Sequence, residues 1–378
     1  MSDAKRDSFF CWMRTGGQAL AEMLAAISAA KTSVRLETYI FNADPVGEKF
    51  REALINACQR GLRVQVLVDA IGSITLSDNF WTTFQTSGGQ FRWFNRVTFA
   101  RFGLRDHRKI LVCDETTAFI GGFNIAKEYD GDGVTEGWRD LGLKIGGPLA
   151  AHLTLAFDEM FASAQQKQKL FARLRKPRQD RLVEEKDADL LLSAPGRRFN
   201  PLKKALRHDL RRAQTVQIMS AYFLPTWRIR RDLHRIAQQG GKVQLIFPGR
   251  SDVALSVLAA RSLYRRMLRA GIEIYEYQPQ ILHAKMILID NVVYAGSANL
   301  DTRSLHLNYE LLVRLKEWDR VVEAREIFTN DLAHCRKIEL ESWRKERNLW
   351  SRMKGRWAYF ILARLDPYIS RRQWKWMR

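Results

Sequence analysis

The chain has 378 residues, enough for two or three domains, and 46% of them are hydrophobic, which is a globular proportion. It carries 62 lysines and arginines against 41 acidic residues, a net charge of +21. That charge predicts an anionic partner, either nucleic acid or a membrane surface. No window approaches ~18 uninterrupted apolar residues and the N-terminus lacks an apolar core, so we expect neither a transmembrane helix nor a signal peptide.

In chain order, the first regular elements are predicted by periodicity. Residues 48–61 have apolar positions at helical spacing and end on a glycine, which favours a helix. Residues 62–69 are short and rich in β-branched side chains, as strands are. A glycine-containing block at 80–94 follows, and then the sequence "DHRKILVCDETTAFIGGFN" from Asp106 to Asn124.

The second part of the chain repeats these blocks in the same order. Residues 27–41, 47–69 and 80–94 match residues 210–224, 229–247 and 263–277, and "LHAKMILIDNVVYAGSANLD" matches the sequence around His107. Val34 and Val216 are 182 residues apart, and His107 and His283 are 176 apart. An internal repeat of alternating helices and strands predicts two similar α/β units.

We therefore predict an α/β fold of two similar α-β-α sandwich halves, related by a pseudo-twofold repeat. The paired motifs described next, together with the resemblance given below, imply that the halves share one active site at their interface. A basic, helical C-terminal tail follows them. The predicted boundaries are 1–164 for the first half, 165–198 for a charged surface connection, 199–335 for the second half and 336–378 for the tail. The sequence predicts no oligomeric state.

Each half contains one copy of the pattern His-x-Lys-x4-Asp, formed by His107, Lys109 and Asp114 and by His283, Lys285 and Asp290. In an extended segment, residues two apart share a face, so each histidine and lysine would point into a common space. A lysine cation repels a metal but suits a phosphate. No carboxylate–histidine cluster has metal-ligand spacing either, and we expect neither a metal nor a cofactor.

Two histidines at one phosphate suggest that one attacks phosphorus and the other transfers protons. Each would need an acceptor on its second ring nitrogen, for which Asp140 and Glu310 are the candidates. Small residues after each motif would allow close backbone approach, and the asparagines could donate to phosphoryl oxygens. These further candidate site residues are Gly122, Asn124, Ser297 and Asn299.

The sequence resembles the phospholipase D superfamily, whose members pair two such motifs at one site. The resemblance covers roughly residues 16–315, and the strings "ETYIF", "WRD", "SAYFLP" and "GSANLDTRS" are similar to those of the bacterial cardiolipin synthases, in particular the shorter form without N-terminal transmembrane helices. It implies a phosphatidyl-histidine intermediate and transfer to a second lipid's hydroxyl, with phosphatidylglycerol as substrate. It also implies that His107 is the nucleophile and His283 the acid and base, an order that the motifs themselves leave open. Asp114 and Asp290 are expected to order the motifs without touching phosphorus.

Residues 336–378 hold 13 lysines and arginines, 4 acidic residues and five of the eleven tryptophans. Trp343, Trp350 and Trp357 are spaced by seven, which predicts one helical face lying on an anionic phospholipid membrane at the cytoplasmic side of the bacterial inner membrane. The alternative is a helix that packs on the core with its tryptophans buried. The superfamily also includes nucleases and hydrolytic phospholipases D, so nucleic acid binding and lipid hydrolysis remain alternatives.

Overall fold

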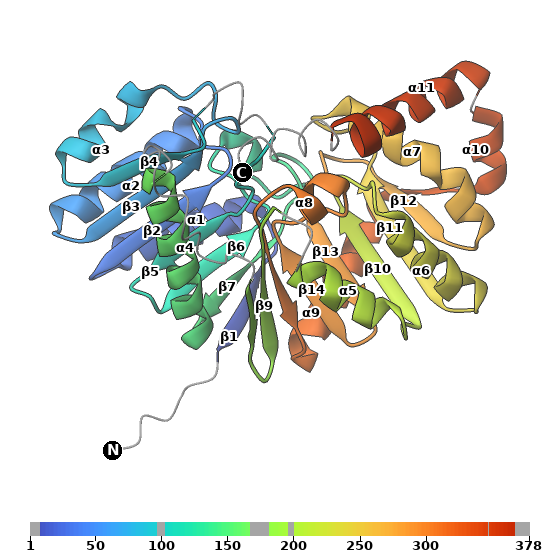
Figure 1. The fold of residues 1–378 in the computed structure, drawn as a ribbon, viewed down its shortest axis with the longest axis horizontal. Helices are drawn as coiled ribbons and strands as arrows, with labels where there is room; N and C mark the ends of the chain where they lie inside the picture. The colour runs from blue at the N-terminus through green and yellow to red at the C-terminus, as the bar shows by residue number, and fades with distance from the viewer. Residues whose placement is uncertain (1–7, 97–102, 167–180, 196–199, 347, 367–378) are drawn as a thin grey trace.

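The computed structural model describes residues 8–96, 103–166, 181–195, 200–346 and 348–366. It contains two mixed sheets with helices on their faces, one from each half of the sequence (Figure 1). The predicted α/β fold with two halves is confirmed. Within the described ranges, no helix is both long and apolar enough to cross a membrane.

The first sheet has seven strands in the order β1-β7-β6-β5-β2-β3-β4. Only β2, β3 and β4 run parallel to one another, and the remaining neighbours are antiparallel. The strands are β1 (Phe9–Met13), β2 (Ser33–Thr38), β3 (Arg63–Asp69), β4 (Gln90–Phe94), β5 (Ile110–Cys113), β6 (Thr117–Gly121) and β7 (Gly142–Gly146). The helices are α1 (Gly16–Ala29), α2 (Pro45–Gln59), α3 (Thr82–Thr86) and α4 (Pro148–Gln166), with 3-10 turns η1 (Asp78–Trp81) and η3 (Lys127–Tyr129).

The second sheet has nine strands in the order β16-β12-β11-β10-β13-β14-β15-β9-β8. The strands are β8 (Arg181–Glu184), β9 (Ala188–Ser193), β10 (Thr215–Ser220), β11 (Lys242–Pro248), β12 (Glu273–Tyr277), β13 (Lys285–Ile289), β14 (Val292–Gly296), β15 (Glu310–Leu315) and β16 (Cys335–Ile338). The helices are α5 (Pro201–Leu210), α6 (Trp227–Gln238), α7 (Ala254–Arg269), α8 (Thr302–His306), α9 (Trp318–Leu332), α10 (Leu340–Glu346) and α11 (Leu349–Phe360), followed by the π-helical turn η5 (Ile361–Leu365). Its seven central strands repeat the first sheet strand for strand.

This equivalence corrects the predicted connection at 165–198. In the second sheet β9 pairs with β15, as β1 pairs with β7 in the first, so the second repeat begins at β9. The buried residues 190–192 form the apolar run of this strand, which the charged residues around it concealed in the sequence. At the other edge, β16 pairs with β12, so the sheet also extends beyond the predicted boundary at 335.

The local sequence explains where a helix begins and where it ends. Helix α2 begins where the Asp44 carboxylate accepts hydrogen bonds from the backbone of Val46 and Gly47, with proline in the first turn. It ends before Gly61, whose φ of +85° a residue with a side chain would adopt only under strain. The sequence therefore sets both ends of this helix.

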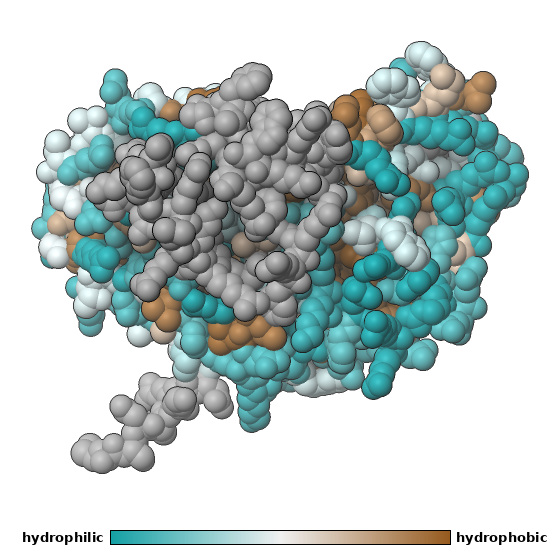
Figure 2. Space-filling view, in the orientation of Figure 1, coloured by the Kyte–Doolittle hydropathy of each residue, from teal (hydrophilic) through white to brown (hydrophobic). Residues whose placement is uncertain are grey.

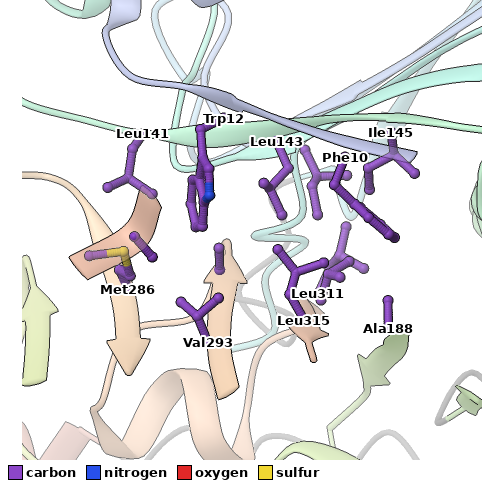
Figure 3. Packing of buried hydrophobic residues seen from close by; sticks show 14 of the residues in the cluster. Phe10, Trp12, Leu141, Leu143, Ile145, Ala188, Met286, Val293, Leu311 and Leu315 are labelled. Atoms are coloured by element: carbon purple, nitrogen blue, oxygen red, sulfur yellow. The ribbon is translucent and has the colours of Figure 1, made fainter. Parts of the chain in front are cut away.

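One hydrophobic cluster joins the two halves. In Figure 3, Phe10, Trp12 and Leu143 of the first sheet face Met286 and Val293 of the second. All five are at most 4% exposed. The halves thus share a core and fix each other's position, in addition to the separate cores beneath the outer helices.

The C-terminal residues also differ from the prediction of one helix with a tryptophan face. Asn348 caps a new helix, α11, by accepting a hydrogen bond from the Ser351 backbone, so the seven-residue spacing does not continue from α10. Trp343, on α10, is 6% exposed and packs against Tyr264 of α7, so it belongs to the core. Trp350 is 61% exposed. The last two tryptophans, at 374 and 376, lie outside the described residues.

Candidate active site

The two motifs meet where the halves meet. His107 and Lys109 lie just before β5, while His283 lies just before β13 and Lys285 is its first residue. The backbone N–H of His107 donates to the carbonyl of Tyr309 at 3.0 Å, and that of His283 donates to the carbonyl of Arg139 at 2.8 Å. Each motif is therefore fixed by backbone that belongs to the other half.

The side chains repeat this crossed arrangement. Nδ1 of His107 lies 3.1 Å from Oε2 of Glu310, and Nδ1 of His283 lies 2.7 Å from Oδ2 of Asp140. Because a carboxylate accepts, each Nδ1 carries the proton, and Nε2 is left with a lone pair. The sequence suggested both carboxylates as partners, but only the structure shows that each comes from the opposite half.

Both lysines are buried beside the imidazoles. Nζ of Lys109 donates to the carbonyl oxygen of His107 at 2.7 Å. Nζ of Lys285 lies beside the ring of His283, 2.8 Å from Nδ1 and 3.2 Å from Nε2, and contacts the carbonyl oxygen of that residue. Burial lowers the pKa of Lys109 to about 7 and also lowers the pKa of Lys285. Burial disfavours the ammonium form, and an anion bound beside the two lysines would offset this effect, so the site favours an anion.

Burial likewise lowers the pKa of both histidines. The charge of Lys285 adds to this effect, and the pKa of His283 falls to about 4 despite the opposing charge of Asp140. For His107 the Glu310 carboxylate opposes burial, and the pKa remains below its ordinary value. Both rings are therefore neutral at pH 7, the state that a nucleophile or a base requires.

Ser297 and Gly122 support the carboxylates. The Ser297 hydroxyl donates to Oε2 of Glu310 at 2.6 Å. Gly122 lies against the carboxylate of Asp140, where a Cβ atom would collide with it. The small residues after each motif, expected to admit a ligand, thus support the carboxylates beside the histidines: Gly122 leaves room for Asp140, and Ser297 donates to Glu310.

The side chains of the two asparagines form hydrogen bonds with neighbouring loop residues. Nδ2 of Asn124 donates to the Tyr129 hydroxyl at 2.7 Å, and its Oδ1 accepts from the Ile40 backbone at 3.0 Å. Oδ1 of Asn299 accepts from the backbone of Tyr222 at 3.4 Å. Their direct contact with a phosphate remains a prediction.

The motif aspartates lie outside the cluster of histidines and lysines. Asp114 accepts hydrogen bonds from the backbone N–H groups of residues 31–33, at the start of β2. Asp290 accepts from those of residues 214 and 215, at the start of β10. Both have a positive φ, of 54° and 46°. Each one therefore fixes the turn after a motif strand to the start of the neighbouring strand.

Aromatic residues next to the histidines were not singled out from the sequence. The ring centroid of Tyr39 lies 5.0 Å from that of His107, while Tyr129 and Trp138 lie 5.2 and 5.6 Å from His283. Tyr39 and Tyr222 occupy matching positions in the repeated strings "ETYIF" and "SAYFL". This match is the sequence signal that could have identified these two tyrosines as candidate site residues.

Comparison with known proteins agrees with this geometry. A family model described as "Cardiolipin synthase, PLD-like domain" matches residues 23–132 and 206–332, one segment in each half. The chain is 31% identical to cardiolipin synthase 1 of Bacillus cereus over 88% of this chain and 68% of that protein. It is 30% identical to cardiolipin synthase B of Salmonella typhi over 95% of this chain and 88% of that protein.

Solved structures share the fold at low identity. Phosphatidylserine synthase of Haemophilus influenzae superposes with a TM-score of 0.72 at 15% identity, over 96% of this chain and 94% of that one. Polyphosphate kinase of Porphyromonas gingivalis gives 0.61 at 14% identity, over 98% of this chain and 54% of that one. With both halves matched by the family model, the chain belongs to the phospholipase D-like family of the cardiolipin synthases.

Proposed function

We propose that this protein is a cardiolipin synthase. It transfers a phosphatidyl group from one phosphatidylglycerol to the hydroxyl of another and releases glycerol. The observation that carries the proposal is the pair of crossed histidine–carboxylate contacts flanked by two buried lysines. The names of the relatives supply the lipid product.

In the first step, Nε2 of His107 attacks phosphorus and the bond from phosphorus to the glycerol oxygen breaks. A proton on Nε2 of His283 passes to that oxygen, and the phosphate anion of the bound lipid favours protonation of His283 beforehand. The product is a phosphatidyl-histidine with free glycerol. The Asp140 carboxylate, whose Oδ2 lies 2.7 Å from Nδ1 of His283, stabilises the imidazolium form of this histidine.

In the second step, the hydroxyl of another phosphatidylglycerol gives its proton to Nε2 of His283. Its oxygen attacks phosphorus, the phosphorus–nitrogen bond breaks and neutral His107 is regenerated. Lys109 and Lys285 stabilise the negative charge on the other phosphoryl oxygens. Water competes with the lipid hydroxyl for the same intermediate, so hydrolysis to phosphatidic acid is the second candidate outcome of this chemistry.

The substrate is a membrane lipid, and we propose that the enzyme works peripherally at the cytoplasmic face of the bacterial inner membrane. The four cysteines are all unpaired, which supports a reducing compartment.

The test is incubation of the purified protein with phosphatidylglycerol vesicles and mass spectrometry of the products and of peptides. We expect cardiolipin and glycerol, and a phosphatidyl adduct on the peptide containing His107. The variants His107→Ala and His283→Ala should each lose several orders of magnitude in turnover. A matched control is His208→Ala, because that side chain is 78% exposed. Phosphatidic acid as the main product would support hydrolysis. An adduct on His283 would show that His283 is the nucleophile and that His107 transfers protons.

A further inference from the structure

Helix α11 carries apolar side chains on a face that no described residue covers. They lie at positions i, i+3, i+7 and i+10, which places them on one side of the helix. They are Trp350, Met353, Trp357 and Phe360, exposed to 61, 47, 66 and 54%. We call these four residues the α11 stripe, and Figure 2 shows hydrophobic residues among hydrophilic ones in this region of the molecule.

The opposite face of α11 already has its partner. Gly355 and Ala358 are buried, and Ala358 packs with Ala259 of α7. Core packing therefore explains one side of this helix and leaves the α11 stripe unexplained. Single exposed apolar residues are common on proteins, but a continuous row that includes two tryptophans indicates an interaction surface.

The surroundings of the α11 stripe are strongly basic. Helices α6 and α7 carry four arginines each, α11 carries three lysines and arginines, and the acidic residue among these three helices is Asp232. In the first half, α2 has two basic and two acidic residues. The positive charge is thus concentrated on the outer helices of one half.

Several of these cations also repel one another. Arg265 of α7 lies near Arg269, Arg344 and Arg352, and their charges lower its pKa. No carboxylate of the described residues forms an ion pair with Arg265. A surface that holds like charges together beside exposed tryptophans is complementary to anionic headgroups above acyl chains.

The chain that follows α11 and η5 is tied through Arg303 to the segment before His107. Arg303 of α8 donates to both carboxylate oxygens of Asp366, at 2.6 and 2.7 Å, directly after η5. It also donates to the carbonyl of Gly103 at 3.2 Å, four residues before His107. A membrane that holds α11 would therefore lie close to the segment that precedes His107.

We propose that α11 is the membrane-docking element of this protein: the α11 stripe inserts at the lipid interface while the cations of α7, α10 and α11 bind anionic phospholipid headgroups. This proposal deepens the proposed function, since it rests on a lipid substrate and adds the surface by which the enzyme reaches it. Nucleic acid is the competing polyanion. Its phosphates would fit the arginines, but a helix face is not the basic groove in which bases stack.

The test uses the full chain with Trp350→Ser and Trp357→Ser combined. The matched control is Trp318→Ser on α9, because Trp318 is equally exposed at 58% and belongs to a different surface. Flotation is measured with phosphatidylglycerol vesicles and with neutral phosphatidylcholine vesicles, in low and high salt. Turnover is measured on vesicles and on a short-chain phosphatidylglycerol that is monomeric in solution.

We expect the double variant to bind anionic vesicles at least about tenfold more weakly than the native chain, and to lose vesicle turnover in proportion. Turnover of the monomeric lipid should persist in it, and the control should match the native chain throughout. High salt should weaken binding of the native chain, because exposed charges are screened. Equal vesicle binding by the double variant would overturn the proposal, as would equal affinity of the native chain for neutral vesicles.

A fluorescence titration with single-stranded DNA tests whether nucleic acid is the partner of this surface. Loss of DNA binding in the double variant, with no vesicle binding by the native chain, would overturn the membrane proposal in favour of nucleic acid. If the native chain binds vesicles through the α11 stripe but makes no cardiolipin from either lipid, the docking surface stands and the proposed synthase activity fails. The docking proposal and the proposed synthase activity are therefore contradicted by different measurements.

Discussion

At the scale of single residues, the candidate site depends on carboxylates that keep two buried imidazoles in one tautomer. Glu310 is fully buried, and although burial opposes its charge, His107, Lys109 and the Ser297 hydroxyl hold its pKa below the usual range. It stays a carboxylate and can accept only from a protonated Nδ1. In the proposed mechanism, Nε2 of each ring is therefore the reacting atom.

Replacing Glu310 by glutamine should lower turnover by roughly 10²–10⁴-fold, because the amide can donate to Nδ1 and move the proton to Nε2. The carboxylate also raises the pKa of His107, so its removal should lower that pKa further. The acidic limb of kcat/KM should then move to lower pH. The measurement is a pH profile, with Glu310→Asp as the control that keeps the charge. A limb that moves to higher pH would contradict this role.

Low pH should destabilise the fold through the same histidines. The pKa of His283 is about 4, below its ordinary 6.5, so folding favours the neutral ring. Its contribution to stability is complete above about pH 6.5 and is lost as the pH falls toward 4. Thermal melting should show this decline, and the His283→Asn variant should show less of it. An equal decline in that variant would assign the effect to other groups.

Gly122→Ala should reduce turnover with little effect on stability. The added methyl group would meet the carboxylate of Asp140 and displace it from His283. We expect a loss of about tenfold or more in kcat. Gly17→Ala is the control, because its nearest contact would be an ordinary 3.4 Å. Unchanged turnover with a lower melting temperature would show that Gly122 matters only for packing.

At the scale of elements, each motif strand is aligned with its neighbour by a turn that contains an aspartate. Asp114 follows β5, has a φ of 54° and accepts hydrogen bonds from the backbone at the start of β2. Asp290 does the same between β13 and β10. The spacing of four residues between lysine and aspartate therefore reflects the length of a strand, and the histidine lies just before the other end of that strand.

Asp114→Ala should lower the free energy of unfolding by about 1–3 kcal/mol, because several backbone N–H groups lose their acceptor. Asp114→Asn should lose less, since asparagine keeps one acceptor oxygen and tolerates a positive φ. Urea denaturation measures both. Turnover of the folded fraction should stay within a few-fold of the native value, and a selective loss of turnover would show that Asp114 takes part in the chemistry.

At the scale of the whole molecule, the two halves form one unit. They share the hydrophobic cluster of Figure 3 and exchange backbone hydrogen bonds at both motifs. A buried ion pair also crosses the interface, since the Arg139 guanidinium donates to both oxygens of Asp331 at 2.8 Å. Neither half can complete the candidate site alone, because each histidine takes its carboxylate from the other.

Arg139→Met should destabilise the protein by about 3–5 kcal/mol, because it leaves the Asp331 carboxylate buried without its partner. Adding Asp331→Leu should restore much of this loss. Calorimetry should show a single unfolding transition in all three proteins, since the halves share a core. Two separated transitions in the native protein would contradict the shared core.

The sequence by itself determined the repeat, the α/β class and both histidine–lysine motifs, because these depend on local periodicity and on residue types at short spacing. It also supplied Asp140 and Glu310 as candidates. Only the tertiary structure decided that the carboxylates cross between halves, since pairing across about 140 to 200 residues depends on how two sheets pack. It also separated Trp343, which is buried against α7, from Trp350 and Trp357, which are exposed. Spacing along the chain cannot distinguish a core face from a binding face, because both are apolar and only the neighbouring elements decide which one is covered.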